Sequence, residues 1–324
     1  MSEEIIRVDH LSHSFGDFSA VDDISFSVKR GEIFSFLGPN GAGKSTTINV
    51  LTTLLPLQKG QVEVAGFDVT ADPAGVRSVI GIVFQEVTLD RDMTAWEILE
   101  FHGRIYGMPK QERREKIDEL LALVELEQKR DTLTKHLSGG MKRRLEIARG
   151  LMTAPEVLFL DEPTIGLDPQ TRLKIWEYIR AINRNGTTIF LTTHYMDEAD
   201  QLSGRIGIID RGKIVAEGSP WELKNALGED IVYLETSEQG RTIEKLGEMA
   251  CVRGIQPKGK GLLVMIDRDG TKALPVMMRR LLHNGIMINT VNLKKPSMDD
   301  VFVHHTGREI RESERPVNTA ARRR

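Results

Sequence analysis

The chain has 324 residues and a formal net charge of −3, with 44 lysine and arginine residues against 47 aspartate and glutamate residues. This near balance excludes the basic field typical of nucleic-acid-binding proteins, so we expect no nucleic acid partner. The length favours two domains, because one core rarely serves so long a chain. The single cysteine, Cys251, excludes an internal disulfide, and no apolar run approaches the roughly 18 residues of a membrane span.

Three stretches near the N-terminus have the apolar pattern of strands, at residues 5–8, 24–28 and 33–37. Phe15 lies between the first two. An exposed aromatic ring ahead of the third strand could stack on a purine base, whereas a phenylalanine in the core or at a strand end explains the residue equally well. Its position alone leaves both interpretations open.

A glycine-rich loop follows the strand at residues 33–37 and precedes a helical pattern, which is the context that a phosphate-binding loop requires. Its glycines permit positive φ and close approach, so that backbone N–H groups can converge on phosphate oxygens at the start of the helix. Lys44 would reach the β- and γ-phosphates, and the Ser45 hydroxyl would bind Mg²⁺. The loop comprises Gly38, Pro39, Asn40, Gly41, Ala42, Gly43, Lys44, Ser45 and Thr46.

Two features come next along the chain. Gln85 follows a buried strand at residues 81–84, where a glutamine could bind Mg²⁺ and an attacking water or could simply belong to a polar loop. The sequence then becomes helical and charged, and Thr94 with Glu97 forms a capping box ahead of apolar residues. We expect an inserted helical subdomain over about residues 94–150, whose charged face is either solvated or docks a partner.

A second glycine-containing motif opens a basic helix. Ser138 is placed to cap this helix, and two glycines expose its first N–H groups, which recreates the geometry of an anion site. Because one small nucleotide cannot easily occupy two such sites in a compact fold, we infer that the second site serves a nucleotide held by another subunit. The motif consists of Leu137, Ser138, Gly139, Gly140 and Met141.

Adjacent carboxylates end the next apolar strand, at residues 157–160. Asp161 can hold Mg²⁺ at the carboxyl end of a central strand, and Glu162 can accept the proton of an attacking water. A surface turn is the alternative, which the phosphate-binding loop in the same domain disfavours. His194 follows a further strand at residues 187–193, where its imidazole could contact the γ-phosphate.

The region from residue 229 to residue 306 has no nucleotide motif and no titratable cluster, so we expect a regulatory or assembly domain. Its pattern predicts the order β-α-β-β-α-β, which is that of a ferredoxin-like α+β domain. The expected strands cover residues 231–235, 251–255, 262–266 and 287–293, and the expected helices cover residues 241–248 and 271–282. Residues 307–324 are polar, and we expect a disordered tail.

The motifs occur in one order along roughly residues 4–225, and in this order the chain resembles the ATP-binding subunits of ABC transporters. The resemblance implies an α/β fold of the P-loop NTPase type over residues 1–228. Such an ABC cassette has a mixed-sheet core, additional antiparallel strands and an inserted helical subdomain. The small C-terminal α+β domain would follow it.

The resemblance also implies a role for each motif. Phe15 would stack on adenine, and Gln85 would sense the γ-phosphate and couple to a membrane subunit. Ser138 and its neighbours would bind ATP in the site of the partner cassette. Asp168 would communicate across the dimer, and His194 would contact the γ-phosphate and position the water. The loop at residues 38–46 and the two carboxylates keep the roles argued above, with ATP and Mg²⁺ as the cofactors.

Met141 stands where many members of the family carry glutamine. With the basic helix that follows it and the segment at residues 293–302, this form resembles the daunorubicin-resistance-type exporters. That subgroup implies a homodimer or a paired cassette, a multispan permease of the ABC-2 type, and a peripheral position at the cytoplasmic face of the cell membrane. The expected function is ATP hydrolysis that powers export of a drug, an antibiotic, a lipid or a similar compound. The alternatives are an importer ATPase and an ABC ATPase that acts on nucleic acid or ribosomes.

Overall fold

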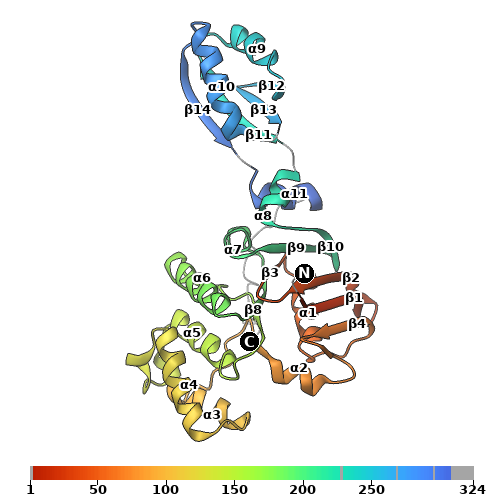
Figure 1. The fold of residues 1–324 in the computed structure, drawn as a ribbon, viewed down its shortest axis with the longest axis vertical. Helices are drawn as coiled ribbons and strands as arrows, with labels where there is room; N and C mark the ends of the chain where they lie inside the picture. Colours follow the sequence, from red (N-terminus) through yellow and green to blue (C-terminus); the bar gives the residue numbers. More distant parts are fainter. Residues whose placement is uncertain (1–2, 227–228, 268, 295, 308–324) are drawn as a thin grey trace, which may run out of the picture. The chain divides into compact units, whose positions relative to one another are not determined.

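The computed structural model of the protein describes residues 3–226, 229–267, 269–294 and 296–307. By its internal contacts the chain forms two compact units, one ending at Glu217 and the other beginning at Gly218 (Figure 1). The second unit thus begins ahead of residue 229, where the sequence pattern placed the domain boundary. It includes helix α8 (Pro220–Ala226) because α8 contacts helix α11 (Met298–Thr306) of the same unit. The expected tail lies outside the described residues, apart from Gly307.

The first unit is built on a six-stranded sheet with the order β10-β9-β3-β8-β7-β6. Strands β6, β7, β8, β3 and β9 run parallel, and every residue of β3, β7 and β8 is buried. Their carboxyl ends therefore meet at one edge of the sheet. The six strands are β3 (Ile33–Leu37), β6 (Ile80–Val83), β7 (Val157–Asp161), β8 (Thr188–Thr193), β9 (Arg205–Asp210) and β10 (Lys213–Gly218).

A second, antiparallel sheet with the order β2-β1-β4-β5 lies in the same unit. Its strands are β1 (Glu4–Phe15), β2 (Phe18–Lys29), β4 (Lys59–Val64) and β5 (Phe67–Asp68). Helix α1 (Lys44–Leu51) contacts β2, β4 and β7, so it lies between the two sheets. The apolar core there is rich in aromatic rings, and its phenylalanines are Phe26, Phe34, Phe36, Phe159 and Phe190.

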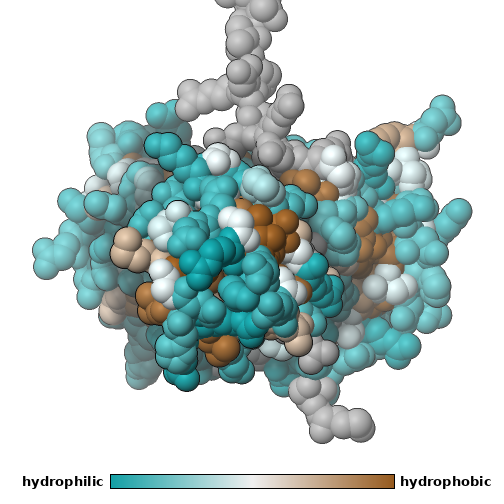
Figure 2. Space-filling view, turned by 90° about the horizontal axis from the view of Figure 1, so that it is seen from above, coloured by the Kyte–Doolittle hydropathy of each residue, from teal (hydrophilic) through white to brown (hydrophobic). Residues whose placement is uncertain are grey.

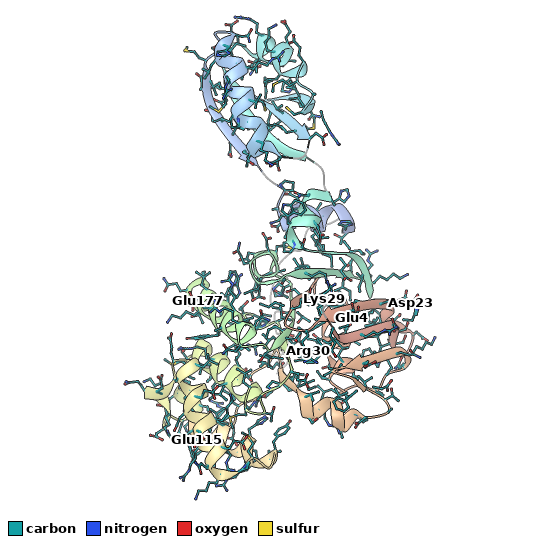
Figure 3. All side chains as sticks on the ribbon, in the orientation of Figure 1. Glu4, Asp23, Lys29, Arg30, Glu115 and Glu177 are labelled. Atoms are coloured by element: carbon teal, nitrogen blue, oxygen red, sulfur yellow. The ribbon has the colours of Figure 1, made fainter. Side chains whose placement is uncertain are left out.

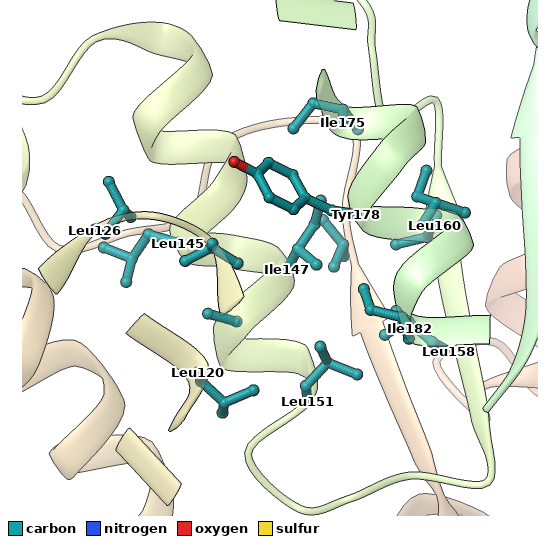
Figure 4. Close-up of a cluster of buried hydrophobic side chains, with 14 of the residues drawn as sticks. Leu120, Leu126, Leu145, Ile147, Leu151, Leu158, Leu160, Ile175, Tyr178 and Ile182 are labelled. Carbon is teal, nitrogen blue, oxygen red and sulfur yellow. The ribbon is translucent and has the colours of Figure 1, made fainter. Parts of the chain in front are cut away.

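Helices form a layer on the central sheet. They are α3 (Ala95–Ile105), α4 (Lys110–Leu123), α5 (Gly139–Gly150) and α6 (Pro169–Arg184), with short 3₁₀ turns at Glu127–Lys129 and Thr134–His136. The expected capping box forms at Thr94, which accepts from the Glu97 N–H while the Glu97 carboxylate accepts from the Thr94 N–H. Side chains of α4, α5, α6 and β7 meet in a buried cluster that holds this layer on the sheet (Figure 4). Helices α2 (Pro73–Val79) and α7 (Met196–Leu202) complete the unit.

The second unit contains a four-stranded antiparallel sheet with the order β12-β13-β11-β14. Its elements are β11 (Glu229–Thr236), α9 (Gln239–Gly247), β12 (Val252–Lys258), β13 (Gly261–Asp267), α10 (Gly270–His283) and β14 (Ile288–Lys294). The order β-α-β-β-α-β confirms the expected ferredoxin-like arrangement. Helices α9 and α10 contact each other and the sheet, and they enclose a separate core around Leu234, Val264 and Met277.

Charged side chains cover much of the surface. Glu115 on α4 and Glu177 on α6 are exposed, and both are labelled among the side chains in Figure 3. The face seen in Figure 2 is mainly hydrophilic, with smaller hydrophobic patches between the charged groups. Among the residues described, no helix has the length and apolar character needed to cross a membrane.

Candidate functional site

The glycine-rich loop joins β3 to α1 at the carboxyl edge of the central sheet. Gly43 caps α1 at a φ of 106°, and a Cβ atom there would lie 2.5 Å from the carbonyl oxygen of Ala20. Glycine is therefore required, because both the positive φ and the close backbone exclude a side chain. The Lys44 ammonium is buried, and it donates to the carbonyl oxygens of Gly38 at 2.7 Å and Pro39 at 3.2 Å.

Strand β7 brings Asp161 to the same edge as its last residue. The Ser45 hydroxyl donates to Asp161 Oδ1 at 3.3 Å, and the Thr192 hydroxyl of β8 donates to the same oxygen. A hydroxyl and a carboxylate in contact beside a phosphate-binding loop fit a Mg²⁺ ion, which typically takes one or two protein ligands together with waters and phosphate oxygens. Asp161 and Ser45 would hold that ion.

Glu162 follows the strand at a φ of 46°, in the left-handed region that a residue with a side chain rarely adopts. Its N–H donates to both the carbonyl oxygen and the hydroxyl oxygen of Thr192, each at 3.1 Å. Its two carboxylate oxygens contact different partners: Oε1 lies 3.1 Å from Lys44 Nζ, and Oε2 lies 3.0 Å from His194 Nδ1. The strained backbone thus aims the carboxylate between a lysine and a histidine.

The charges of this buried group shift its pKa values. Burial raises the pKa of Glu162, but the hydrogen bond with His194 and the charge of Lys44 outweigh it, so the net shift is downward. Burial lowers the pKa of Lys44, and the charges of Glu162 and Asp161 only partly oppose that change. Glu162 is therefore ionised at neutral pH and can accept a proton or a hydrogen bond.

Lys44, Ser45, Asp161, Glu162 and His194 thus come from distant parts of the sequence and form one contiguous cluster. Phe15, Gln85, Ser138 and Asp168 are expected site residues whose side chains make no hydrogen bond or ion pair with that cluster in the part of the chain that the structure describes. Phe15 ends β1 and is 52% exposed, which suits stacking better than a role in the core. Gln85 is exposed in a bend after β6.

The two remaining motifs begin helices. Ser138 caps α5, and its hydroxyl oxygen accepts from the Met141 N–H at 3.3 Å. Asp168 caps α6 and accepts from the N–H and the hydroxyl of Thr171, which lower the pKa of the Asp168 carboxyl. Leu137 is buried, and Met141 packs against the core of the helical layer. Ser138 is thus the N-cap of α5, and its hydroxyl satisfies the N–H at the third position of the helix.

Three residues of the site are absent from the sequence-based prediction. Thr192 holds both Asp161 and the Glu162 backbone, and its only signal is a hydroxyl group near the end of a buried strand. Arg143 and Glu146 of α5 lie buried beside the same turn. Neither residue carries a sequence signal of its own, because charged residues within a helix are typical of a solvated face.

Comparison with known proteins agrees with this geometry. Residues 21–165 match the ABC transporter family, and residues 218–306 match the C-terminal domain of ATP-binding proteins of the DrrA1-3 type. The daunorubicin resistance ATP-binding protein DrrA3 of Streptomyces coeruleorubidus is 38% identical, over 97% of this chain and 99% of that protein. The daunorubicin/doxorubicin resistance ATP-binding protein DrrA of Streptomyces peucetius is 40% identical over 93% and 92%. The Nod factor export ATP-binding protein I of Ralstonia nicotianae is 38% identical over 96% of each chain.

Solved structures of ATP-binding cassettes match about two thirds of this chain. The ADP conformation of the ATP-binding cassette MJ1267 has a TM-score of 0.62 and 31% identity, covering 70% of this chain and 95% of that one. A dimeric post-hydrolysis state of the cassette MJ0796, bound to ADP and Pi, has a TM-score of 0.60 and 29% identity, covering 66% and 98%.

The chain belongs to the ATP-binding subunits of ABC transporters. Within that family it combines the cassette with a C-terminal domain of the DrrA type. It binds ATP, and its reaction is ATP hydrolysis coupled to transport across a membrane. Cassettes of this family form dimers, as the MJ0796 structure does.

Proposed function

We propose that this subunit powers the export of an antibiotic-like or lipid-like compound through a separate membrane permease of the ABC-2 type. The observation that carries this proposal is similarity along both units, because the relatives named for drug resistance and for Nod factor export match nearly the whole chain. The second unit matters here, since it matches the DrrA1-3-type domain. The subunit would act at the cytoplasmic face of the membrane.

The residues of the cluster divide the chemistry between them. Lys44 would leave Glu162 for the β- and γ-phosphates of ATP, which frees the carboxylate to act as the general base. His194 contacts that carboxylate and would position the attacking water against the γ-phosphate. A Mg²⁺ ion on Ser45 and Asp161 would stabilise the charge that develops on the phosphate oxygens. Gln85 would extend toward this ion from its exposed bend.

A complete site would need two copies of the chain. The start of α5 presents N–H groups and the Ser138 hydroxyl, yet neither contacts the cluster around Lys44 within one chain. We propose that residues 137–141 close over ATP held by residues 38–46 of the partner copy, with Asp168 at the boundary between the two sites. Phe15 would stack on the adenine ring.

We assign to the permease a groove between helix α3 and strand β6. It encloses about 360 Å³ and is lined by residues that include Leu54, Thr88, His102 and Tyr106. Large apolar side chains are exposed beside it, and they are Leu54, Val87, Phe101, Ile105 and Tyr106. Because Thr88 lies on the loop that begins near Gln85, a helix docked in this groove would sense the state of that loop.

The Glu162→Gln variant tests the assignment of the base. We expect it to keep ATP affinity but to hydrolyse ATP about 10²-fold more slowly or worse, since the amide cannot accept the proton of water. Dimers with bound ATP should then accumulate, which light scattering with Mg-ATP would detect. The matched control is Glu156→Gln, which changes an exposed carboxylate that is paired with Arg30 just before the same strand.

The control should hydrolyse ATP at the parental rate. If the Glu162→Gln variant binds ATP and still hydrolyses it at that rate, or stays monomeric, the assignment is wrong. Export is tested separately, by the recovery of a six-span permease with the tagged subunit from the membranes of its own cells. Recovery of an importer's permease would contradict the proposed direction.

A further inference from the structure

Arg143 is 4% exposed, although arginine is rarely buried, and its guanidinium reaches the turn that carries Glu162. Nε donates to the carbonyl oxygen of Pro163 at 2.8 Å. Nη2 donates to the carbonyl oxygens of Asp161 at 2.9 Å and Glu162 at 3.1 Å. One planar group thus binds three successive carbonyls, from the last residue of β7 and the two residues that follow it.

The same guanidinium holds two further groups. Nη1 donates to the carbonyl oxygen of Phe84, the residue before Gln85, and lies 3.2 Å from the carboxylate of Glu146. Glu146 is fully buried, and its other oxygen accepts from the N–H of Thr88 at 2.8 Å. The Arg143–Glu146 pair therefore joins α5 to the ends of β6 and β7 at once.

The contacts of Arg143 stabilise a strained backbone at Glu162. In an extended strand successive carbonyls point to opposite sides, so the strand must end in a turn for one guanidinium to bind three of them, and Glu162 at the centre of this turn has a φ of 46°. A strained backbone persists when its surroundings over-determine it. The Thr192 hydroxyl oxygen accepts from the Glu162 N–H, and Arg143 donates to the Glu162 carbonyl oxygen. The two peptide units that flank the Glu162 Cα atom are thus both held.

A purely stabilising role is a weaker explanation. Burying an ion pair costs desolvation free energy that the attraction between the charges barely offsets, and apolar residues of similar size often stabilise a protein equally well. Arg143 also begins the second turn of the helix that starts at the Ser138 motif. A movement of α5 would consequently be transmitted to the Glu162 carboxylate through the Arg143 side chain.

We propose that Arg143 is a positioning residue that holds Glu162 in its hydrolytic orientation and links that orientation to helix α5 and to the Gln85 loop. The inference rests on the proposed role of Glu162 as the general base. Lysine cannot replace it, because an ammonium group lacks the planar fork that spans three carbonyls. The Glu146 carboxylate holds the Arg143 guanidinium in this position through their ion pair.

The test compares Arg143→Gln, Arg143→Lys and the double variant Arg143→Gln/Glu146→Gln with the parent. Each is assayed for Tm, for ATP affinity with a fluorescent analogue, and for kcat at a temperature where it is folded. We expect kcat to fall roughly 10- to 100-fold in all three, with ATP affinity within about twofold of the parent, because only the orientation of the base changes. The double variant should regain part of the lost Tm but none of the lost kcat.

Arg113→Gln is the matched control. Arg113 also forms a largely buried pair with Glu100 and donates to the carbonyl oxygen of Met108, but it lies in the helical layer away from the Glu162 turn. This variant should lose Tm and keep kcat when folded. A double variant whose kcat returns together with its Tm would overturn the proposal, as would a folded Arg143→Gln protein with parental kcat. If Glu162→Gln keeps parental hydrolysis, the proposed function fails instead, whatever the Arg143 variants do.

Discussion

Burial and neighbouring charges shift the pKa values of single titratable residues in the first unit. Lys44 and Glu162 are each about 4% exposed and hold one another as an ion pair. His102 is different, because burial and the nearby charge of Arg149 lower its pKa to about 4. It lines the groove that we assign to the permease, and it is therefore neutral at physiological pH.

The His102 shift predicts how stability depends on pH. The unfolded chain binds a proton near pH 6.5 and the folded chain only near pH 4, so the folded state loses stability as the pH falls from 6.5 toward 4. Urea unfolding midpoints at pH 7.5, 6.5 and 5.5 would measure this loss. In a His102→Gln variant the midpoint should fall less over the same range. Parallel curves for parent and variant would contradict a half-buried histidine that is neutral in the folded state.

At the scale of elements, α5 and α6 pack so closely that glycine is needed at one position and not at its neighbour. A Cβ atom on Gly140 would lie 2.5 Å from Thr171 Cγ2, and the Thr171 hydroxyl is already bound to the Asp168 cap at 2.6 Å. A Cβ atom on Gly139 would meet Leu167 at 4.0 Å, which is ordinary contact. Close packing against α6 therefore requires glycine at position 140 but not at position 139.

Paired alanine substitutions test this difference. Gly140→Ala should destabilise the protein by about 1–3 kcal/mol, because the methyl group displaces Thr171 and disturbs the Asp168 cap. Gly139→Ala should be neutral or stabilise by a few tenths of a kcal/mol, since alanine favours the helix. Chemical denaturation of both variants measures the two values, and equal destabilisation would show that the helices do not pack as described. Hydrolysis is unsuitable as the measure, because both residues belong to the proposed ATP-binding motif.

At the scale of the whole molecule, the chain combines a nucleotide-hydrolysing unit with a second unit that has its own sheet and core. The phosphate-binding loop and the Ser138 motif lie in different elements of the first unit. If ATP joins them between two copies, the functional unit is a dimer with two shared sites. Activity should then depend on which copy supplies which half of each site.

Mixing two inactive variants tests the shared sites. Lys44→Ala removes the phosphate-binding charge, and Ser138→Arg fills the second anion site with a bulky cation, so each variant alone should lose ATP hydrolysis. A mixed dimer contains one intact site and one doubly damaged site, and activity should return to a fraction of the parental value. Differently tagged copies, purified in succession, confirm that mixed dimers form. No gain of activity in such dimers would indicate that each chain uses both motifs for its own nucleotide.

Local patterns in the sequence predicted much of the structure. The phosphate-binding loop needs glycines at set positions, the capping box at Thr94 needs two side chains three residues apart, and both are legible without tertiary contacts. The order of elements in the second unit was also predictable, because each strand and helix shows its own period. The fold class is confirmed, whereas the roles of the individual site residues stay predictions.

Tertiary contacts determined the rest. Strand pairing lengthened β1 and β2 well beyond their apolar segments, because hydrogen bonds between neighbours sustain a strand where its own residues do not. Above all, the partners of Glu162 come from the loop after β3, the end of β8 and the middle of α5. Sequence motifs could propose Glu162 as the base, but only the packing of these segments could bring Arg143 and Thr192 into contact with its backbone.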